Sequence, residues 1–575
     1  MKPKLFSIIK HANTELSGGQ LTKDIISGII VAIIALPLSV ALAISSGVTP
    51  DKGLVTAIIA GFLISFLGGS RVQIGGPTGA FVIIVYGIIE QYGVSGLTIA
   101  TIMAGIFMIF FGLMKFGSII KYVPYPTTTG FTAGIAVTLL STQVNDFFGL
   151  GIKNVPSEFF EKWSLYIENF SKLHLPTFLI GLFSILVIVL WPKINKTIPG
   201  SLIALIASTA IVALFDLPVE TIGSRFGEIS SKISLIDFGS FQVTVPLLKD
   251  LIRPAITIAF LASIESLLSA VVADGMIGKK HNSNMELVAQ GIANIGSALF
   301  GGIPATGAIA RTAANIKNGG RTPVSGIVHA LVLLLIMKIF MPLASLVPMT
   351  SLAAILVVVA YNMSEWRACK ALLKSTKSDI AVLASTFLFT VIFDLVVAIE
   401  IGMVIAMFLF VKRMADSIHI SEISNTGSVL SSLTSEEEDE SYLENDLHKN
   451  LKKEVFLYEI NGPLFFGAAN KFLDVMNEID RKSSVIILKM KNVPNMDATA
   501  FDALKRIQNR CREKHILLLY AEINDQPMKL LTNTGFVAMN GEDRFFSLTE
   551  DAIRKANEII ECKQTSRTIR AKINK

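Results

Sequence analysis

Residues 301–320 read GGIPATGAIARTAANIKNGG, and residues 75–80 read GGPTGA. Both stretches lie in a long apolar region, and each places two glycines and a proline shortly before Thr-Gly-Ala. Gly and Pro interrupt regular structure, whereas Pro in a first turn and Thr at a cap position begin a helix. The two stretches therefore predict two helices that start in mid-membrane.

The composition predicts a membrane protein. The 575 residues are 51% hydrophobic and 17% charged, with a mean hydropathy of +0.59, whereas soluble proteins carry about 25% charged residues. The apolar sequence is concentrated in residues 22–414, and residues 415–575 are ordinary polar sequence. We expect a transmembrane domain over residues 1–414, followed by a soluble domain.

Several functional classes are disfavoured. The three cysteines, Cys369, Cys511 and Cys562, show no metal or redox spacing, and no signal peptide is evident at the N-terminus. The net charge of +6 lies mostly in loops and the C-terminal tail, which favours membrane orientation over nucleic-acid binding. No nucleophile–base pair or nucleotide-binding loop is visible, so we expect neither an enzyme nor a bound cofactor or metal.

Fourteen apolar stretches can be counted, and several are shorter than the about 20 residues of a full span. They fall near residues 24–46, 53–69, 78–89, 95–114, 125–143, 175–191, 200–215, 252–273, 286–300, 306–316, 324–346, 350–362, 379–394 and 398–411. Lys and Arg are concentrated in the even-numbered connections, which predicts that both termini are cytoplasmic.

Matched landmarks indicate an internal repeat. Thr78 and Thr306 are 228 residues apart, as are Pro37 and Glu265 in the first and eighth stretches. A seven-span unit used twice has an odd number of spans, so the second copy is inverted, as in many secondary transporters. Two half-helices would then point their N-termini at each other near the bilayer centre.

Such helix ends predict an anion site. A helix N-terminus offers unpaired N–H groups and about half a positive charge, which together bind anions without a metal. The alternative is that the glycines only allow close helix packing. The predicted site consists of Thr78, Gly79, Ala80, Ala305, Thr306, Gly307 and Ala308.

Charged residues inside the apolar region predict ion coupling. Glu265 is an ionisable group in an apolar span, which is costly and usually functional or paired. It suits a proton-coupling site, or a Na⁺ site together with Ser269. Arg311 either adds positive field at the anion site or points to the cytoplasmic surface. His329 is expected to be a packing residue with satisfied hydrogen bonds.

The soluble region predicts a small α/β domain. Residues 415–450 are acidic and Ser-rich, which indicates a flexible linker. Strands are expected near EVFLYEI, VIILKMKN and HILLLYAE, and helices at 469–480, 498–513 and 526–533, with a loose basic tail over 563–575. Asp497 is expected to cap the second helix, which places Thr499 in its first turn, where a phosphate is favourable.

These motifs resemble a known family. GGPTGAFV, IESLLSAVVADG, GGIPATGAIARTAANIKNGGRTPVSGI and FDLVVAIEIG are similar to the sulfate permease (SulP) family, whose relatives include the mammalian multifunctional anion exchangers and prestin. NGPLFFG and NMDATA are similar to its STAS domain, which places that domain at residues 451–562. The resemblance implies fourteen spans in the uracil-transporter fold, with a core of spans 1–4 and 8–11 and a gate of spans 5–7 and 12–14.

The resemblance also implies a mechanism. Family members move sulfate, bicarbonate, chloride, oxalate or dicarboxylates, commonly as homodimers, by an elevator movement of core against gate. Sodium-driven bicarbonate members have Asp where Glu265 stands and Thr where Ser269 stands, so these departures favour H⁺ over Na⁺. In related STAS domains a phosphorylated Ser stands where this chain has Thr499, and Ala500 replaces the following Gly.

We therefore predict an H⁺-coupled anion symporter in a bacterial inner membrane, with a possible cytoplasmic partner for the STAS domain. A Na⁺-dependent bicarbonate symporter is the close alternative, and a nucleobase transporter of the same fold is the alternative from another class. A membrane part that only docks a regulatory STAS domain to its partners is a third alternative.

Overall fold

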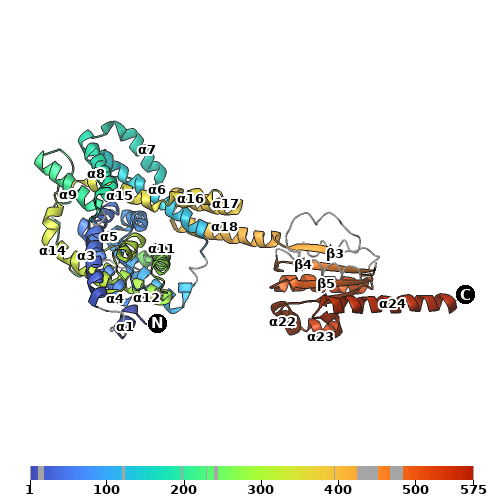
Figure 1. Ribbon diagram of the computed structural model, residues 1–575. Coiled ribbons are helices and arrows are strands. Elements are labelled where there is room, and N and C mark those ends of the chain that lie inside the picture. The colour runs from blue at the N-terminus through green and yellow to red at the C-terminus, as the bar shows by residue number, and fades with distance from the viewer. Residues whose placement is uncertain are drawn as a thin grey trace. The chain divides into compact units, whose positions relative to one another are not determined.

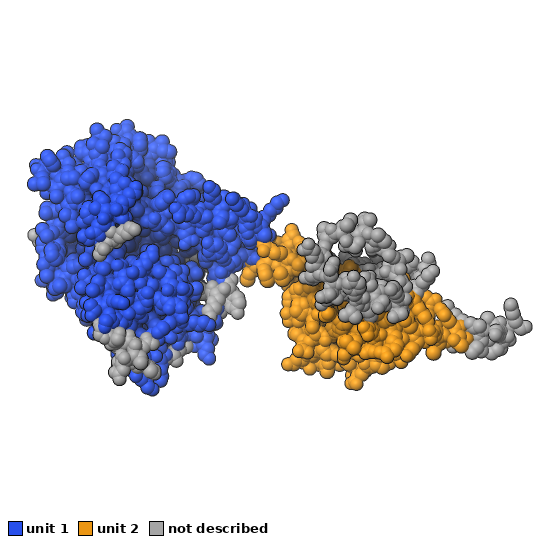
Figure 2. All heavy atoms as spheres, viewed as in Figure 1, with its two compact units in different colours: residues 1–406 blue, residues 407–575 orange. Residues whose placement is uncertain are grey.

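A computed structural model describes residues 2–10, 18–118, 123–195, 198–227, 229–237, 244–393, 395–423, 451–452, 454–466 and 484–573. The chain divides into two compact units, residues 1–406 and residues 407–575 (Figure 2). Each unit is described by itself.

The first unit is helical, and each of the fourteen predicted stretches corresponds to a helical segment (Figure 1). Seven helices among the described residues are long and apolar enough to cross a membrane, and α9 is a shorter apolar helix. The segments are α3 (Gly18–Ser45), α4 (Pro50–Leu67), the two parts of α5 (Val82–Leu113), α6 (Tyr125–Phe148), α8 (Leu175–Ile194), α9 (Gly200–Leu214), α11 (Val245–Ile277), α12 (Ser283–Leu299), α13 (Ile309–Lys317), α14 (Val324–Ala344), α15 (Met349–Met363), α17 (Lys377–Ile392) and α18 (Leu395–Asp416).

Helix α5 holds the third and fourth predicted stretches. A 3₁₀ turn, η1 (Gly79–Phe81), leads into it, and Gly93 interrupts it with φ 69° and ψ −178°. That conformation is accessible to glycine and strained for other residues. The first part of α5 is therefore a short helix that starts at η1 and ends at a kink. The glycine-rich motif predicts its start, and the short apolar stretch 78–89 predicts its length.

Helix packing follows the inverted repeat. In the repeat, α4 corresponds to α12, and the second part of α5 corresponds to α14. The contact between α12 and α5 should therefore have an equivalent between α4 and α14, and both contacts are present. Likewise α6 corresponds to α15 and α8 to α17, and both α6–α17 and α15–α8 contacts are present. The helices that correspond in the two halves thus meet equivalent neighbours.

The two glycine motifs meet in a short sheet. β1 (Gly75–Gly76) pairs antiparallel with β2 (Thr306–Gly307), with Gly75 opposite Gly307 and Gly76 opposite Thr306. All four residues are buried. Because the pairing is antiparallel, the chains pass each other before they enter α5 and α13.

Short helices that the apolar pattern does not predict complete this unit. They are α1 (Lys4–Lys10), α7 (Phe159–Asn169), η3 (Phe170–Lys172), α10 (Ile222–Phe226) and α16 (Trp366–Leu372). Among them, α7 lies in the long connection between α6 and α8 and packs on α6 and α17.

The second unit contains a five-stranded sheet in the order β3-β4-β5-β6-β7. β3 (His419–Ile423) is antiparallel to β4 (Val455–Asn461), whereas β4, β5 (Val485–Asn492), β6 (Leu517–Ala521) and β7 (Phe545–Phe546) are parallel. The helices are α21 (Ala498–Glu513), α22 (Asp525–Asn533), α23 (Phe536–Asn540) and α24 (Thr549–Ile573).

Alternation along β5 builds two apolar cores. Ile486 and Leu488 belong to the cluster that includes α21, whereas Val485 and Ile487 belong to the cluster with α24. Successive side chains of a strand point to opposite faces, so one apolar strand serves both layers. The strand predicted for VIILKMKN and the helix predicted at 498–513 are confirmed.

Two expectations for this unit need correction or qualification. The tail is not loose, because α24 continues to Ile573; residues 549–573 contain no Gly or Pro and many strong helix formers. Residues 419–423, placed in the linker by composition, form β3. The predicted helix at 469–480 and residues 424–450 lie outside the described residues.

Candidate anion site

The first half-helix presents free backbone donors. Thr78 is extended, with φ −130° and ψ 161°, and its side chain does not cap the helix as expected. The N–H of Phe81 bonds to the carbonyl of Thr78. The N–H groups of Gly79 and Ala80 have no protein acceptor in the described part of the chain, as expected for a first turn.

The second half-helix differs. The N–H of Ala305 donates to Asn294 Oδ1 at 2.8 Å, and Gly307 N donates to Ser266 Oγ at 3.1 Å. Ala308 N donates to the carbonyl of Ile74 at 2.9 Å. Three of the backbone donors predicted on this side are therefore already bonded to the protein.

The side chain of Thr306 is likewise engaged in packing. Its Oγ1 lies 2.6 Å from Ser266 Oγ and donates to the carbonyl of Ala262 at 3.2 Å. Both partners lie on α11, so Thr306 fixes β2 to that helix. A Cβ at Gly307 would overlap the side chain of Gln73, so any larger residue there would require Gln73 to move.

Glu265 lies next to the first half-helix. Thr78 Oγ1 donates to Glu265 Oε2 at 2.9 Å. Among the described residues Glu265 forms no ion pair, although the charge of Arg311 acts on it. The structure therefore does not support an ion pair between Glu265 and a Lys or Arg. Its carboxylate is bonded instead to Thr78, which directly precedes the free N–H groups of Gly79 and Ala80.

Arg311 is directed into the unit. The residue is 1% exposed, which rules out the cytoplasmic-surface alternative. Its Nη2 donates to the carbonyl of Pro77, and its Nε and Nη1 have no partner within the described residues. A positive side chain from α13 thus reaches the segment that leads into the first half-helix.

Ser269 differs from expectation in its partners. Ser269 Oγ donates to Thr312 Oγ1 at 3.4 Å, and no hydrogen bond to Glu265 is seen among the described residues. Ser269 therefore ties α11 to α13.

The side chain of His329 also differs from expectation. Both of its ring nitrogens are buried without a partner in the described part of the chain, so the prediction that its hydrogen bonds are satisfied is wrong.

Two apolar side chains cover the first half-helix. A Cβ at Gly79 would lie 2.9 Å from Leu139 Cδ2 on α6 and 3.1 Å from Met363 Sδ on α15. Gly79 therefore allows the start of the half-helix to pack closely against α6 and α15.

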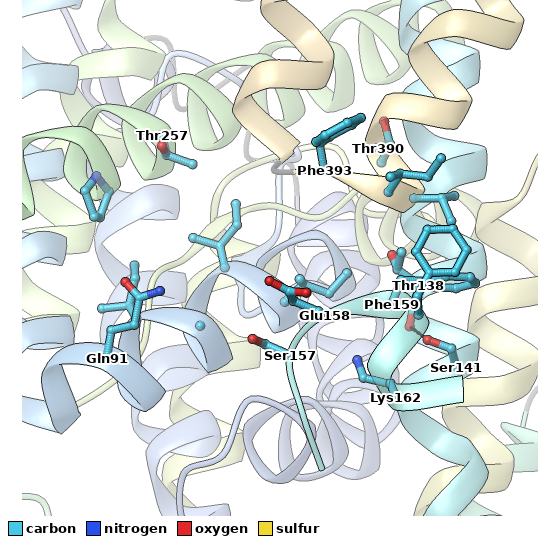
Figure 3. Close-up of a pocket in the computed structure, with 18 of the residues that line it drawn as sticks. Gln91, Thr138, Ser141, Ser157, Glu158, Phe159, Lys162, Thr257, Thr390 and Phe393 are labelled. Atoms are coloured by element: carbon cyan, nitrogen blue, oxygen red, sulfur yellow. Dashed lines mark hydrogen bonds between the residues drawn. The ribbon is translucent and has the colours of Figure 1, made fainter. Parts of the chain in front are cut away.

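A cavity of about 770 Å³ adjoins the other end of this half-helix. One wall is the first part of α5, including Ile84 and Gln91, and the others are parts of α6, α7, α11 and α17 (Figure 3). Thr78 and Glu265 are not among its lining residues. It reaches the half-helix from the side of the α6–α8 connection.

In the second unit, Asp497 and Thr499 lie where the sequence predicts them, at the start of a helix. Asp497 is the N-cap of α21: its Oδ1 accepts from Ala500 N at 2.8 Å and its Oδ2 from Phe466 N at 2.9 Å. Thr499 is exposed in the first turn. The cap is confirmed, and its hydroxyl neighbour is open to solvent.

Comparison with known proteins identifies the family. Residues 21–386 match the sulfate permease family, and residues 447–552 match the STAS domain. The chain belongs to the sulfate permease family. It is thus a multi-pass membrane protein of a family of anion transporters, and not an enzyme, as the sequence predicts.

Individual relatives agree with this placement. YvdB of Bacillus subtilis is 42% identical over 526 residues, 91% of this chain and 96% of its own. The transmembrane domain of a cyanobacterial bicarbonate transporter, BicA, is 31% identical, with a TM-score of 0.60 over 66% of this chain and 97% of its own. Murine Slc26a9, an anion transporter solved in the inward-facing state, has a TM-score of 0.80 at 17% identity, over 93% of this chain and 91% of its own.

The residues that sequence reasoning missed are polar groups on α11 and α12 and in the segment that leads into β1. Asn294, Ser266 and Gln73 hold β2 and its surroundings. Asn294 stands in the apolar stretch GIANIGSAL, so an isolated amide in an apolar helix was the available signal. Ser266 is adjacent to Glu265 but carries no distinguishing pattern.

Proposed function

We propose that this protein is a secondary active transporter of small anions, of the sulfate, bicarbonate or dicarboxylate class, which moves its substrate together with H⁺. The observation that supports this most is the hydrogen bond from Thr78 to Glu265. It places a half-buried carboxyl group against the residue that precedes the free N–H groups of Gly79 and Ala80.

Electrostatics links the two ligands. An anion held by the first-turn N–H groups and by the field of Arg311 would be repelled by an ionised Glu265 in a medium of low dielectric constant. Protonation of Glu265 removes that repulsion, so that the anion and the proton bind together. Release of the proton on the other side of the membrane expels the anion.

The movement that exposes the site alternately is proposed to be of the elevator type. Spans 1–4 and 8–11, which contain β1, β2 and Glu265, form the core, and spans 5–7 and 12–14 form the gate. Close packing of Gly79 on Leu139 and Met363 is consistent with a contact between core and gate that must slide. We further propose a homodimer in the bacterial inner membrane, with both termini in the cytoplasm.

The STAS domain is proposed to be regulatory. Thr499 is exposed beside the N-cap of α21, where a phosphate on its hydroxyl would be favoured by the helix dipole. Phosphorylation or a cytoplasmic protein bound there would change the surface of α21 without altering the transport site.

Purified protein in proteoliposomes tests the function. Radiolabelled sulfate, bicarbonate and fumarate are each offered with an imposed inward H⁺ gradient, and separately with an inward Na⁺ gradient or with choline in its place. We expect at least one anion to accumulate with the H⁺ gradient and to be indifferent to choline. Accumulation that requires Na⁺ supports the bicarbonate symporter alternative instead, and competition by uracil supports a nucleobase substrate.

A further inference from the structure

The cavity of about 770 Å³ beside the first half-helix contains a buried, unpaired charge. We name it the Lys162 cavity. Lys162 lies on α7 and is 5% exposed, and no acceptor or acidic partner contacts its ammonium group within the described residues. Lysine is almost never buried unless it is paired, and the acidic charge that acts on Lys162, that of Glu90, comes from an exposed side chain that does not contact it.

Other side chains in the Lys162 cavity can also donate. Gln91 and Tyr92 of α5, and Ser157 ahead of α7, line it, and their side chains show no protein hydrogen-bond partner among the described residues. Figure 3 shows the amine of Lys162 turned toward Ser157 and Glu158. By contrast, the hydroxyls of Thr138 and Ser141 are used on backbone carbonyls.

The charges in the Lys162 cavity are arranged by depth. Glu158, Asp250 and Arg253 line it but are exposed to solvent, whereas Lys162 is buried. Water screens the exposed groups more strongly than the buried one. The cavity therefore has a positive charge at its buried wall, and the neutral donors of Gln91, Tyr92 and Ser157 line the same space, which suits a small anion.

Position connects this cavity with transport. Its wall is the same half-helix whose N-terminus carries Gly79 and Ala80, and α11 carries both Glu265 and the wall residue Thr257. We propose that the Lys162 cavity is a second anion site, where a small inorganic or carboxylate anion is held by Lys162 with Gln91, Tyr92 and Ser157. That the anion passes from this cavity to the site at Thr78 rests on the proposed transport function, whereas anion binding in the cavity does not.

Cysteine protection measures the binding alone. In the full chain with its three native cysteines replaced, S157C is labelled with neutral N-ethylmaleimide in the presence of sulfate, bicarbonate or chloride at constant ionic strength. At least one anion should slow labelling of S157C in the K172M background but not in the K162M background. Lys172 is the matched control, because it lies in the same connection, bonds Asn169 and does not line the cavity.

Uptake measures the role in transport. K162M should raise the KM for the external anion about tenfold, as for loss of one charge-assisted hydrogen bond, with kcat largely kept. K162R should restore the KM, and K172M should leave it unchanged. Because methionine in place of an unpaired buried charge should not reduce the melting temperature, that temperature controls for folding.

The outcomes separate the two proposals. Protection that depends on Lys162, without uptake of any anion, keeps the second site and overturns the transport function. Uptake with equal protection in the K162M and K172M backgrounds, or with no protection by any of the three anions, overturns the second site and leaves the transport function standing.

Discussion

At the scale of single residues, the hydroxyl of Thr78 carries most of the proposed coupling, because it bonds directly to Glu265. Thr306, its counterpart in the repeat, bonds to Ser266 and Ala262. The two threonines stand at equivalent positions of the repeat but have different partners. Thr78 contacts the ionisable group of Glu265, whereas Thr306 holds β2 against α11.

Thr78→Val tests that assignment. It removes a hydrogen bond to a charged group, which is worth about 1.5–3 kcal/mol, so we expect H⁺-driven uptake to fall about tenfold or more. Thr98→Val is the matched control, since Thr98 is buried on α5, which follows Thr78, and within the described residues its hydroxyl bonds only the carbonyl of Val94. Equal uptake by the two variants contradicts a coupling role for Thr78.

The proposed anion site at Lys162 predicts that anion binding depends on pH. Burial lowers the pKa of its ammonium group to about 8, while the charge of Glu90 opposes that shift. An anion binds the charged form, so the apparent affinity for external anion should fall as pH rises through about 8, and should be constant well below it. The other ionisable groups that face or line the cavity are Tyr92, Glu158, Asp250 and Arg253.

The measurement is the KM for external anion between about pH 6 and pH 9, with the internal pH fixed, compared with K162M. In K162M, the rise of the KM above about pH 8 should be absent. If K162M keeps the wild-type profile, another group titrates.

At the scale of elements, the break in α5 creates the short first half-helix. Gly93 has no neighbour within 4 Å of a Cβ position, so its requirement is conformational and not steric. Ending the first part of α5 there allows the second part to pack on α12 independently.

Gly93→Ala should therefore lower stability by about 1–3 kcal/mol, because only glycine adopts this backbone conformation without strain. Gly87→Ala, in the regular part of the same helix and equally uncrowded, should be neutral or slightly stabilising. Thermal unfolding of the purified full chain compares them. A melting temperature for G93A at or above that of G87A contradicts the kink.

The sequence predicts elements better than it predicts partners. Apolar stretches and the Gly-Gly and Pro signals locate the helical segments and both half-helix starts, because burial in lipid acts on each segment separately. The bonds of Ala305 to Asn294 and of Gly307 to Ser266 depend on packing between helices, and no local pattern encodes them. Lys162 is missed for the same reason, since its burial arises from the packing of α7 on α6 and α17.

At the scale of the whole molecule, an even number of spans puts both ends of the membrane domain on one side. On this proposed topology, the Lys162 cavity opens on the opposite side of the membrane from the two ends of the membrane domain. This assignment rests on the distribution of Lys and Arg in the connections.

Labelling of intact cells with an impermeant maleimide checks the sidedness. S157C should react from outside, whereas the exposed native Cys562 should react only after the cells are permeabilised. C562S without S157C supplies the background. Labelling of Cys562 in intact cells contradicts the cytoplasmic location of the STAS domain.

The central claim is that protonation of Glu265 couples the anion to H⁺, and Glu265→Gln tests it most directly, because Gln resembles the protonated acid. In proteoliposomes, accumulation of labelled anion against its gradient is measured beside counterflow with unlabelled anion inside. We predict that E265Q loses H⁺-driven accumulation and keeps counterflow. Undiminished H⁺-driven accumulation by E265Q would contradict the claim.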